Sequence, residues 1–207
     1  MKNVIIVGNS VEMMYHENGK FIDSHDAVIR LGRGYHTKGR EKELGSKMDM
    51  WATGWLRSNH LKMIPNDVKI LHNRMRINLL KNKVPKLGEN FTTMFSDKEL
   101  LTIMDEFGFK NNSEIGRPSN GFITLLYFLR KETNWKTLTI IGFDFFAKTL
   151  GFKCGEAYPF SWHLPENSIP NHPHFAEVER DAVLHYAETI SNFKWILLSD
   201  LKKEVIF

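Results

Sequence analysis

The sequence predicts an α/β fold with a mostly parallel sheet, built as one domain over residues 1–207. Short apolar runs alternate with segments of helical spacing, and two of the runs, residues 4–7 and 138–141, stop at a glycine. Strands of a parallel sheet are covered on both faces, so they read as continuous apolar runs. At 207 residues the chain is long enough for one sizeable core and short for two domains.

The first 53 residues predict a βαβ beginning. Residues 4–7 form a first strand, residues 11–19 a short helix closed by Gly19, and residues 27–31 a second strand. Residues 32–45 are rich in glycine and basic side chains and predict a loop, after which residues 49–53 form a third strand.

The remainder continues the alternation. Further strands are predicted at residues 68–72, 138–142 and 195–198. Ser96 caps a helix that ends at Gly108, a second apolar helix follows Ser119, and a third spans residues 175–191. The proline-rich stretch between the last two helices predicts a long loop or lid.

Composition excludes several classes of protein. Hydrophobic residues make up 42% and charged residues 25% of the chain, which is typical of a soluble globular protein and excludes disordered and fibrous ones. The net charge of +4 mildly favours an anionic partner without choosing among ligand, membrane surface and nucleic acid. With a single cysteine, no apparent leader and no apolar run of about 20 residues, we expect a cytoplasmic protein with at most peripheral membrane contact.

Two turns carry short polar side chains where an anion could bind. Gly8-Asn9-Ser10 follows the first strand, and Ser119-Asn120-Gly121 begins the apolar helix. Unpaired N–H groups at a helix start favour phosphate or carboxylate, and ligands of open α/β sheets sit beyond the strands' carboxyl ends. The alternative for the first turn is an ordinary connection in which Ser10 is only an N-cap.

A third candidate lies in the histidine-containing segment before the last helix. His174 or His172 could take a proton from a hydroxyl nucleophile, with Glu177 or Glu179 holding the ring. The alternative is that these histidines are surface loop residues. A zinc site that also uses His163 lacks the regular framing of common zinc sites, and we expect no metal.

Other chemistries lack their motifs. No G-x-G-x-x-G follows the first strand, and the sequence has no G-x-x-x-x-G-K-[ST] and no G-x-S-x-G. It also has no Asp-x-Asp pair to hold a metal–diphosphate. A sugar transferase with this sequence would therefore be metal-independent.

These pieces resemble a known family. Residues 7–10, 22–30 and 44–47 together resemble the large sialylmotif of the eukaryotic-type sialyltransferases in wording, order and spacing. Residues 118–121 with 140–143 resemble the small sialylmotif, and residues 174–179 fit the very small motif, His-x-x-x-x-Glu. The resemblance touches about the first 50 residues and residues 117–190.

The resemblance implies a Rossmann-like domain, the sialyltransferase-type variant of the GT-A fold. It implies transfer of a sialic acid from a CMP-activated donor to a glycan hydroxyl, of lipopolysaccharide or capsule type, with inversion and with neither metal nor cofactor. CMP-Kdo is an alternative donor, because both sugars are 2-keto acids. The other alternative is a non-catalytic module that binds nucleotide or carbohydrate. No nucleic-acid partner is expected.

The resemblance also assigns roles to residues. His174 is the expected base, with His172 as the alternative because it also has a glutamate five residues on, and His163 assists the leaving phosphate. Asn9 contacts the CMP phosphate, and Glu179 completes the very small motif. The residues implied in donor binding are Gly8, Asn9, Ser10, Arg30, Gly32, Ser119, Asn120, Gly121, Gly142, Phe143 and Asp144.

The sequence departs from the family pattern at two points. Gly32 and Arg33 stand where the family has an asparagine after the arginine of the large motif, so one phosphate contact is lost or replaced. The disulfide of the Golgi enzymes is absent, as expected for a microbial or viral member. Gly142-Phe143-Asp144 also echoes a Gly-x-Asp segment of a second bacterial sialyltransferase family.

Overall fold

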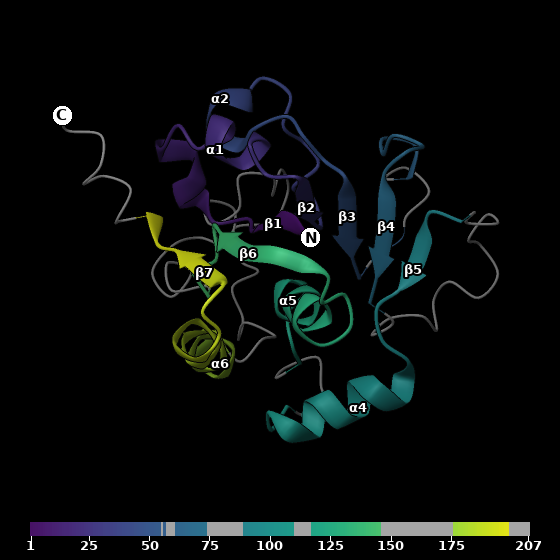
Figure 1. Ribbon diagram of the computed structural model, residues 1–207. Helices are drawn as coiled ribbons and strands as arrows, with labels where there is room; N and C mark the ends of the chain where they lie inside the picture. The colour runs from purple at the N-terminus through teal and green to yellow at the C-terminus, as the bar shows by residue number, and fades with distance from the viewer. Residues whose placement is uncertain (55, 57–60, 74–88, 110–116, 146–175, 199–207) are drawn as a thin grey trace, which may run out of the picture.

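A computed structural model describes residues 1–54, 56, 61–73, 89–109, 117–145 and 176–198. Its centre is one seven-stranded sheet in the order β5-β4-β3-β2-β1-β6-β7, with every neighbouring pair parallel (Figure 1). The strands are β1 Lys2–Val7, β2 Ala27–Leu31, β3 Met50–Thr53, β4 Lys69–His72, β5 Phe91–Thr93, β6 Trp135–Ile141 and β7 Phe193–Ile196. The predicted α/β fold with a mostly parallel sheet is confirmed.

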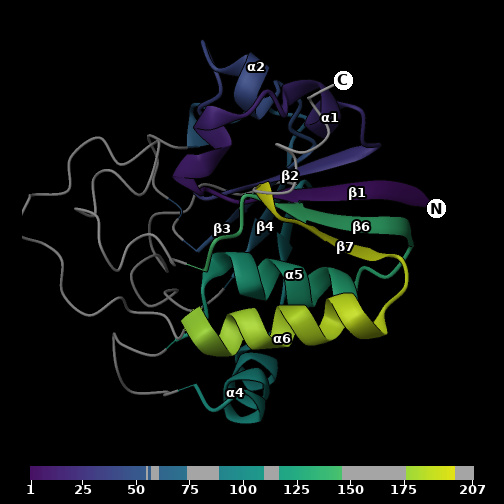
Figure 2. The ribbon, with the colours of Figure 1, turned by 90° about the vertical axis from the view of Figure 1, so that its left-hand side faces the viewer.

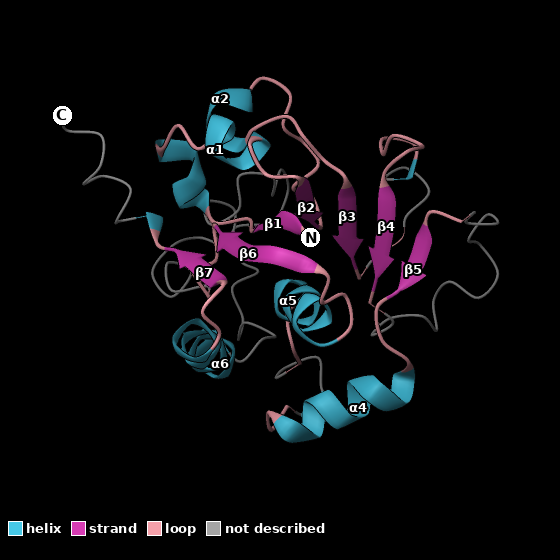
Figure 3. Cartoon of the chain, viewed as in Figure 1, coloured by secondary structure: helices cyan, strands magenta, loops and turns pink. Residues whose placement is uncertain are grey.

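Helices cover both faces of this sheet (Figure 3). The helices are η1 Val11–Tyr15, α1 Gly19–Asp23, α2 Glu41–Leu44, α4 Asp97–Glu106, α5 Asn120–Arg130 and α6 Ala176–Thr189. Figure 1 shows α1 and α2 on one face and α4, α5 and α6 on the other. None of the helices in the described residues is both long and apolar enough to cross a membrane.

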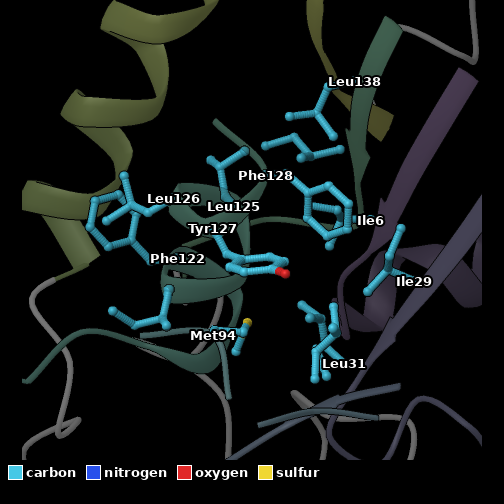
Figure 4. Close-up of a cluster of buried hydrophobic side chains, with 14 of the residues drawn as sticks. Ile6, Ile29, Leu31, Met94, Phe122, Leu125, Leu126, Tyr127, Phe128 and Leu138 are labelled. Atoms are coloured by element: carbon cyan, nitrogen blue, oxygen red, sulfur yellow. The ribbon is translucent and has the colours of Figure 1, made fainter. Parts of the chain in front are cut away.

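Alternation along β1 supplies both halves of the core. Val4 and Ile6 pack toward α5, whereas Ile5 and Val7 join the cluster under η1, α1 and α2. Figure 4 shows the larger cluster, where side chains of β1, β2 and β6 meet those of α5. Every residue of α5 from Gly121 to Phe128 is buried, as its nearly unbroken apolar sequence requires. Each fully buried large apolar side chain contributes about 1.5–3 kcal/mol.

Three details differ from the sequence-based expectations. The strand β5 was not predicted, because Phe91–Thr93 is short and half polar. Gly19 begins α1 instead of ending a helix that starts at residue 11; a Cβ there would lie 2.0 Å from Glu41 O, so this glycine allows close approach to α2. The expected loop over residues 32–45 contains the single turn α2.

The strand order reverses at β1. From β1 the chain adds β2 to β5 on one side and then crosses over to add β6 and β7 on the other. The carboxyl ends of the strands lie at one edge, opposite the N-terminus (Figure 2). Open α/β sheets bind ligands in the crevice at such a switch point. The switch point lies between β1 and β6, and Gly8 and Gly142 directly follow these two strands.

Candidate functional site

The turns after β1 and β6 interlock. Gly8 N donates to Ile141 O at 2.8 Å, and Ser10 N donates to Gly142 O at 3.1 Å. A Cβ at Gly8 would lie 2.2 Å from Gly142 O, so only glycine permits this approach. Gly142 itself has a φ of 71°, the left-handed region that glycine adopts freely. The turns that contain Gly8 and Gly142 therefore form one backbone unit.

Ser10 is engaged within this unit. Its Oγ donates to Asp144 Oδ2 at 3.0 Å and accepts from Glu12 N at 3.3 Å. Ser10 therefore caps η1, and its expected role in donor binding stays a prediction. The bond to Asp144 joins the turn after β1 to the Gly-x-Asp segment after β6.

Asn9 is directed at the turn that follows β2. Its Nδ2 donates to Leu31 O at 3.1 Å, and its buried Oδ1 has no hydrogen-bond partner among the residues that the structure describes. A Cβ at Gly34 would lie 2.7 Å from that Oδ1, so this glycine allows the Asn9 side chain to approach the turn closely. One of the two N–H donors of this amide is thus used within the protein, and the expected contact between Asn9 and phosphate stays a prediction.

The start of α5 forms the second part of the site. Ser119 is its N-cap, and Ser119 Oγ accepts from Phe122 N at 3.1 Å. In an α-helix the first N–H groups lack intrahelical acceptors, so the N–H groups of Asn120 and Gly121 have no acceptor within α5 and lie at the positive end of the helix dipole. Gly121 lies against Phe143: a Cβ there would be 2.9 Å from Phe143 Cε1. The contact places this helix start beside the turn after β6.

Asn120 is fixed by an amide bridge. Its Nδ2 donates to Ala52 O at 2.8 Å, and its Oδ1 accepts from Asn73 Nδ2 at 2.7 Å. The expectation that the Asn120 side chain holds the donor is therefore modified: its amide ties α5 to the ends of β3 and β4. Asn73 was missed by the sequence analysis, although its place directly after an apolar run matches that of Asn9 after β1.

Glu179, on α6, reaches under the start of α5. It is only 2% exposed, its Oε1 accepts from Ser119 N at 2.5 Å, and its Oε2 accepts from Ser119 Oγ at 2.6 Å. Burial raises the pKa of this carboxyl to about 7, against the effect of the two hydrogen bonds. Ser119 is a partner that the sequence analysis did not foresee for Glu179. The expected histidine partners, His174 and His172, lie outside the described residues, as does His163.

Arg30 is a correction to the predicted donor-binding set. It is 1% exposed, and its guanidinium donates to Lys47 O and Leu44 O, both at 2.9 Å. Burial lowers its pKa to about 10, while the charge of Asp23 acts in the opposite direction. With its side chain enclosed on the α2 face, Arg30 holds the chain before β3 in place.

Other parts of the large-motif resemblance are also structural. Asp23 accepts from Ser46 N, Ser46 Oγ and Lys47 N, and Lys47 Nζ donates to His25 O at 2.6 Å. Burial opposes ionisation of Asp23, but these hydrogen bonds lower its pKa overall. The segments 22–30 and 44–47 therefore bond to each other, while residues 8–10 contribute to the switch-point edge.

Gly32 lies at the end of β2, close to Asn9. Gly32 N donates to Ala52 O at 2.8 Å, and Gly32 O accepts from Trp51 Nε1 at 2.6 Å.

Within the described residues, no group of three His, Cys, Asp or Glu side chains is placed to hold a metal ion.

Comparison with known sequences decides the family. The sequence profile of glycosyltransferase family 29 (sialyltransferase) matches residues 1–131, more than half of the chain. The chain belongs to glycosyltransferase family 29. It is therefore a glycosyltransferase, and the resemblance to sialyltransferases in its sequence is confirmed. Among curated protein sequences, none matches this family 29 chain.

Solved structures with the same fold are sialyltransferases. Two crystal structures of a mammalian sialyltransferase, one in complex with Gal-beta-1-3GalNAc-ortho-nitrophenol, superpose with a TM-score of 0.61. They are 16% and 18% identical, and the alignments cover 93% and 94% of the family 29 chain and 68% of each neighbour. The sialyltransferase CstII from Campylobacter jejuni is 16% identical and superposes with a TM-score of 0.55. The alignment covers 96% of the family 29 chain and 80% of CstII. These likenesses confirm the predicted sialyltransferase-type fold.

Proposed function

We propose that this glycosyltransferase moves a sialic acid, or a similar 2-keto sugar acid, from a CMP-activated donor to a hydroxyl of a glycan of lipopolysaccharide or capsule type. The observation that carries the proposal is the start of α5 held against the joined turns after β1 and β6. Family membership supports it, as does the CstII structure, which was solved with cytidine 5'-monophosphate.

The chemistry of this edge suits a single phosphate. The N–H groups at the start of α5 and the positive end of its dipole favour an anion, and several glycines bring backbone close to the switch point. The sequence lacks the glycine-rich loops with which proteins usually hold a diphosphate. We therefore infer a preference for CMP over UDP-sugars and NAD.

The proposed reaction is an inverting substitution without metal. The acceptor oxygen forms a bond to the anomeric carbon as the bond from that carbon to the CMP phosphate breaks, and the acceptor proton passes to His174 as general base. CMP leaves with the bonding electron pair, and His163 assists its phosphate. A positioned base contributes about 10²- to 10⁴-fold in rate. Donors fixed in advance on the leaving oxygen stabilise charge that develops there.

Thermal-shift titration tests the ligand class. CMP at about 100 times its dissociation constant stabilises the folded state by roughly 2.7 kcal/mol, and we expect UDP and NAD to stabilise it less. Incubation with CMP-sialic acid and with CMP-Kdo, each with and without a glycan acceptor, then identifies the sugar. Stabilisation by UDP or NAD but not by CMP contradicts the proposal. CMP binding without hydrolysis or transfer of either donor identifies a non-catalytic binding module.

The histidine assignment is tested by substitution. His174→Ala should lower kcat by about 10²- to 10⁴-fold with CMP affinity nearly unchanged. His172→Ala is the matched control, since it removes an imidazole two residues away. If His172→Ala abolishes turnover while His174→Ala does not, His172 is the base. If neither lowers turnover, the general-base assignment fails.

A further inference from the structure

Glu179 and Ser119 form a closed pair beneath the start of α5. Both carboxylate oxygens of Glu179 accept from Ser119, one from its N–H and one from its hydroxyl. The same hydroxyl oxygen accepts from Phe122 N as the N-cap of α5. The Ser119 O–H hydrogen is thus directed into the protein whenever Glu179 is ionised, and it is unavailable to a ligand.

A neutral Glu179 would reverse one of these hydrogen bonds. The carboxyl proton on Oε2 would donate to Ser119 Oγ, and Oε1 would still accept from Ser119 N. Since a hydroxyl has one hydrogen and two acceptor lone pairs, Ser119 Oγ would then accept from both Phe122 N and Glu179, leaving its own hydrogen free. Loss of the Glu179 charge would also remove a repulsion from any anion bound at this helix start.

We propose that Glu179 is a positioning residue that controls the direction of the Ser119 hydroxyl: neutral Glu179 releases this O–H to donate to an oxygen of the anionic sugar donor, and ionised Glu179 withdraws it. The inference rests on the proposed function, because it takes the start of α5 as the donor site. The residue acts on the donor through Ser119, and Glu179 itself needs no contact with substrate.

The surroundings of Glu179 allow both protonation states near neutral pH. Its burial raises the pKa to about 7, and the two hydrogen bonds from Ser119 act in the opposite direction. The acidic, basic and histidine side chains of the described residues on the elements that meet here are Arg117 before α5, Arg130 on α5, Lys136 on β6, Asp144 after β6, Glu177, Arg180, Asp181, His185 and Glu188 on α6, and Lys194 on β7. Burial and the Ser119 hydrogen bonds, rather than these charges, set the pKa of Glu179.

Glu179→Gln imitates the neutral carboxyl. The glutamine amide nitrogen can donate to Ser119 Oγ while its oxygen accepts from Ser119 N, so the Ser119 hydrogen is released at every pH. Glu188→Gln, on an exposed carboxylate of the same helix, is the matched control. Ser119→Ala removes the hydroxyl and with it the part of the coupling between protonation and binding that depends on the direction of the O–H.

The experiment is calorimetric titration of CMP into each variant between pH 6 and pH 9. The ligand's own ionisation affects all variants alike, so the ratio of wild-type to Glu179→Gln dissociation constants isolates the effect of Glu179. One pH unit above its pKa about a tenth of Glu179 is neutral, and the ratio should rise about tenfold there if only the neutral form binds. The Glu188→Gln ratio should stay flat, and Ser119→Ala should bind weakly and with less of the added pH dependence.

A second readout uses only the wild type and Ser119→Ala. At pH 7.5, titrations in buffers of different ionisation enthalpy should show proton uptake on CMP binding by the wild type and less uptake by Ser119→Ala; this comparison holds even if Glu179→Gln fails to fold. A wild-type to Glu179→Gln ratio that is flat across pH, or equal proton uptake in wild type and Ser119→Ala, overturns the inference and leaves the CMP donor intact. Absence of CMP binding at every pH overturns the donor proposal as well.

Discussion

Replacing Gly8 by alanine is expected to damage both the stability and the site of this glycosyltransferase. The added Cβ would lie 2.2 Å from Gly142 O and 2.6 Å from Gly142 C, whereas real Cβ contacts are not closer than 3.0 Å. The turns after β1 and β6 must therefore separate by about 0.8 Å, the difference between 3.0 and 2.2 Å. The neighbours in this clash are backbone atoms, which cannot turn aside as a flexible side chain does.

The energetic cost follows from what that separation breaks. Overpacking of a closely packed site costs about 1–3 kcal/mol. The bonds from Gly8 N to Ile141 O and from Ser10 N to Gly142 O lie in the strained region, and each contributes about 0.5–1.5 kcal/mol. We expect Gly8→Ala to lower the free energy of unfolding by about 2–4 kcal/mol, a large part of the roughly 5–15 kcal/mol that holds a typical domain together.

Urea denaturation followed by tryptophan fluorescence measures the stability loss, and calorimetry measures CMP affinity below the unfolding transition. Gly39→Ala is the matched control: Gly39 has a φ of 78° with nothing near its absent Cβ, so alanine should cost about 1–2 kcal/mol from backbone strain and leave CMP binding unchanged. If Gly8→Ala unfolds within 0.5 kcal/mol of the wild type, or binds CMP equally well, the interlocked turns do not have the role assigned to them.

Three further predictions follow from buried or capping groups. Arg30→Met leaves two backbone carbonyls without their donor and Asp23 without its neighbouring charge, so urea denaturation should show a loss of about 3 kcal/mol, with CMP affinity of the folded fraction unchanged. Ser96→Ala removes the capping box of α4 and should cost about 1 kcal/mol, whereas no effect would show that the cap is dispensable. Glu179 holds a proton more tightly in the folded state, so thermal denaturation should show the wild type losing stability relative to Glu179→Gln as pH rises from 4.5 to 7; parallel profiles contradict this.

The parallel sheet was predictable because local sequence dictates it. The run at residues 4–7 and the run ending at Ile141 are apolar for the reason that helices cover both faces of their strands, and this signal does not depend on distant contacts. β5 was missed since three half-buried residues with two threonines carry no comparable pattern. Gly19 was misassigned because a glycine required for close packing and a glycine that ends a helix look alike in sequence.

The site divides in a similar way. The turns at residues 8–10, 119–121 and 142–144 were identified from glycine and short polar residues at strand and helix ends, and the structure brings them together. Sequence alone did not show which polar groups of these turns form hydrogen bonds within the protein. The partners of Asn120, the enclosure of Arg30 and the pairing of Glu179 with Ser119 depend on contacts 14 to 68 residues apart along the chain.

Transfer from a CMP-activated donor in the presence of EDTA tests the central claim most directly. The purified protein is incubated with CMP-sialic acid and a galactose-terminated acceptor, with CMP release followed by chromatography and the anomeric configuration of the product by NMR. The account predicts CMP release in equal amount to a glycoside of inverted configuration, undiminished by EDTA. Retention of configuration, activity that returns only when a divalent metal is added, or transfer from a UDP-sugar in place of the CMP donors would contradict it.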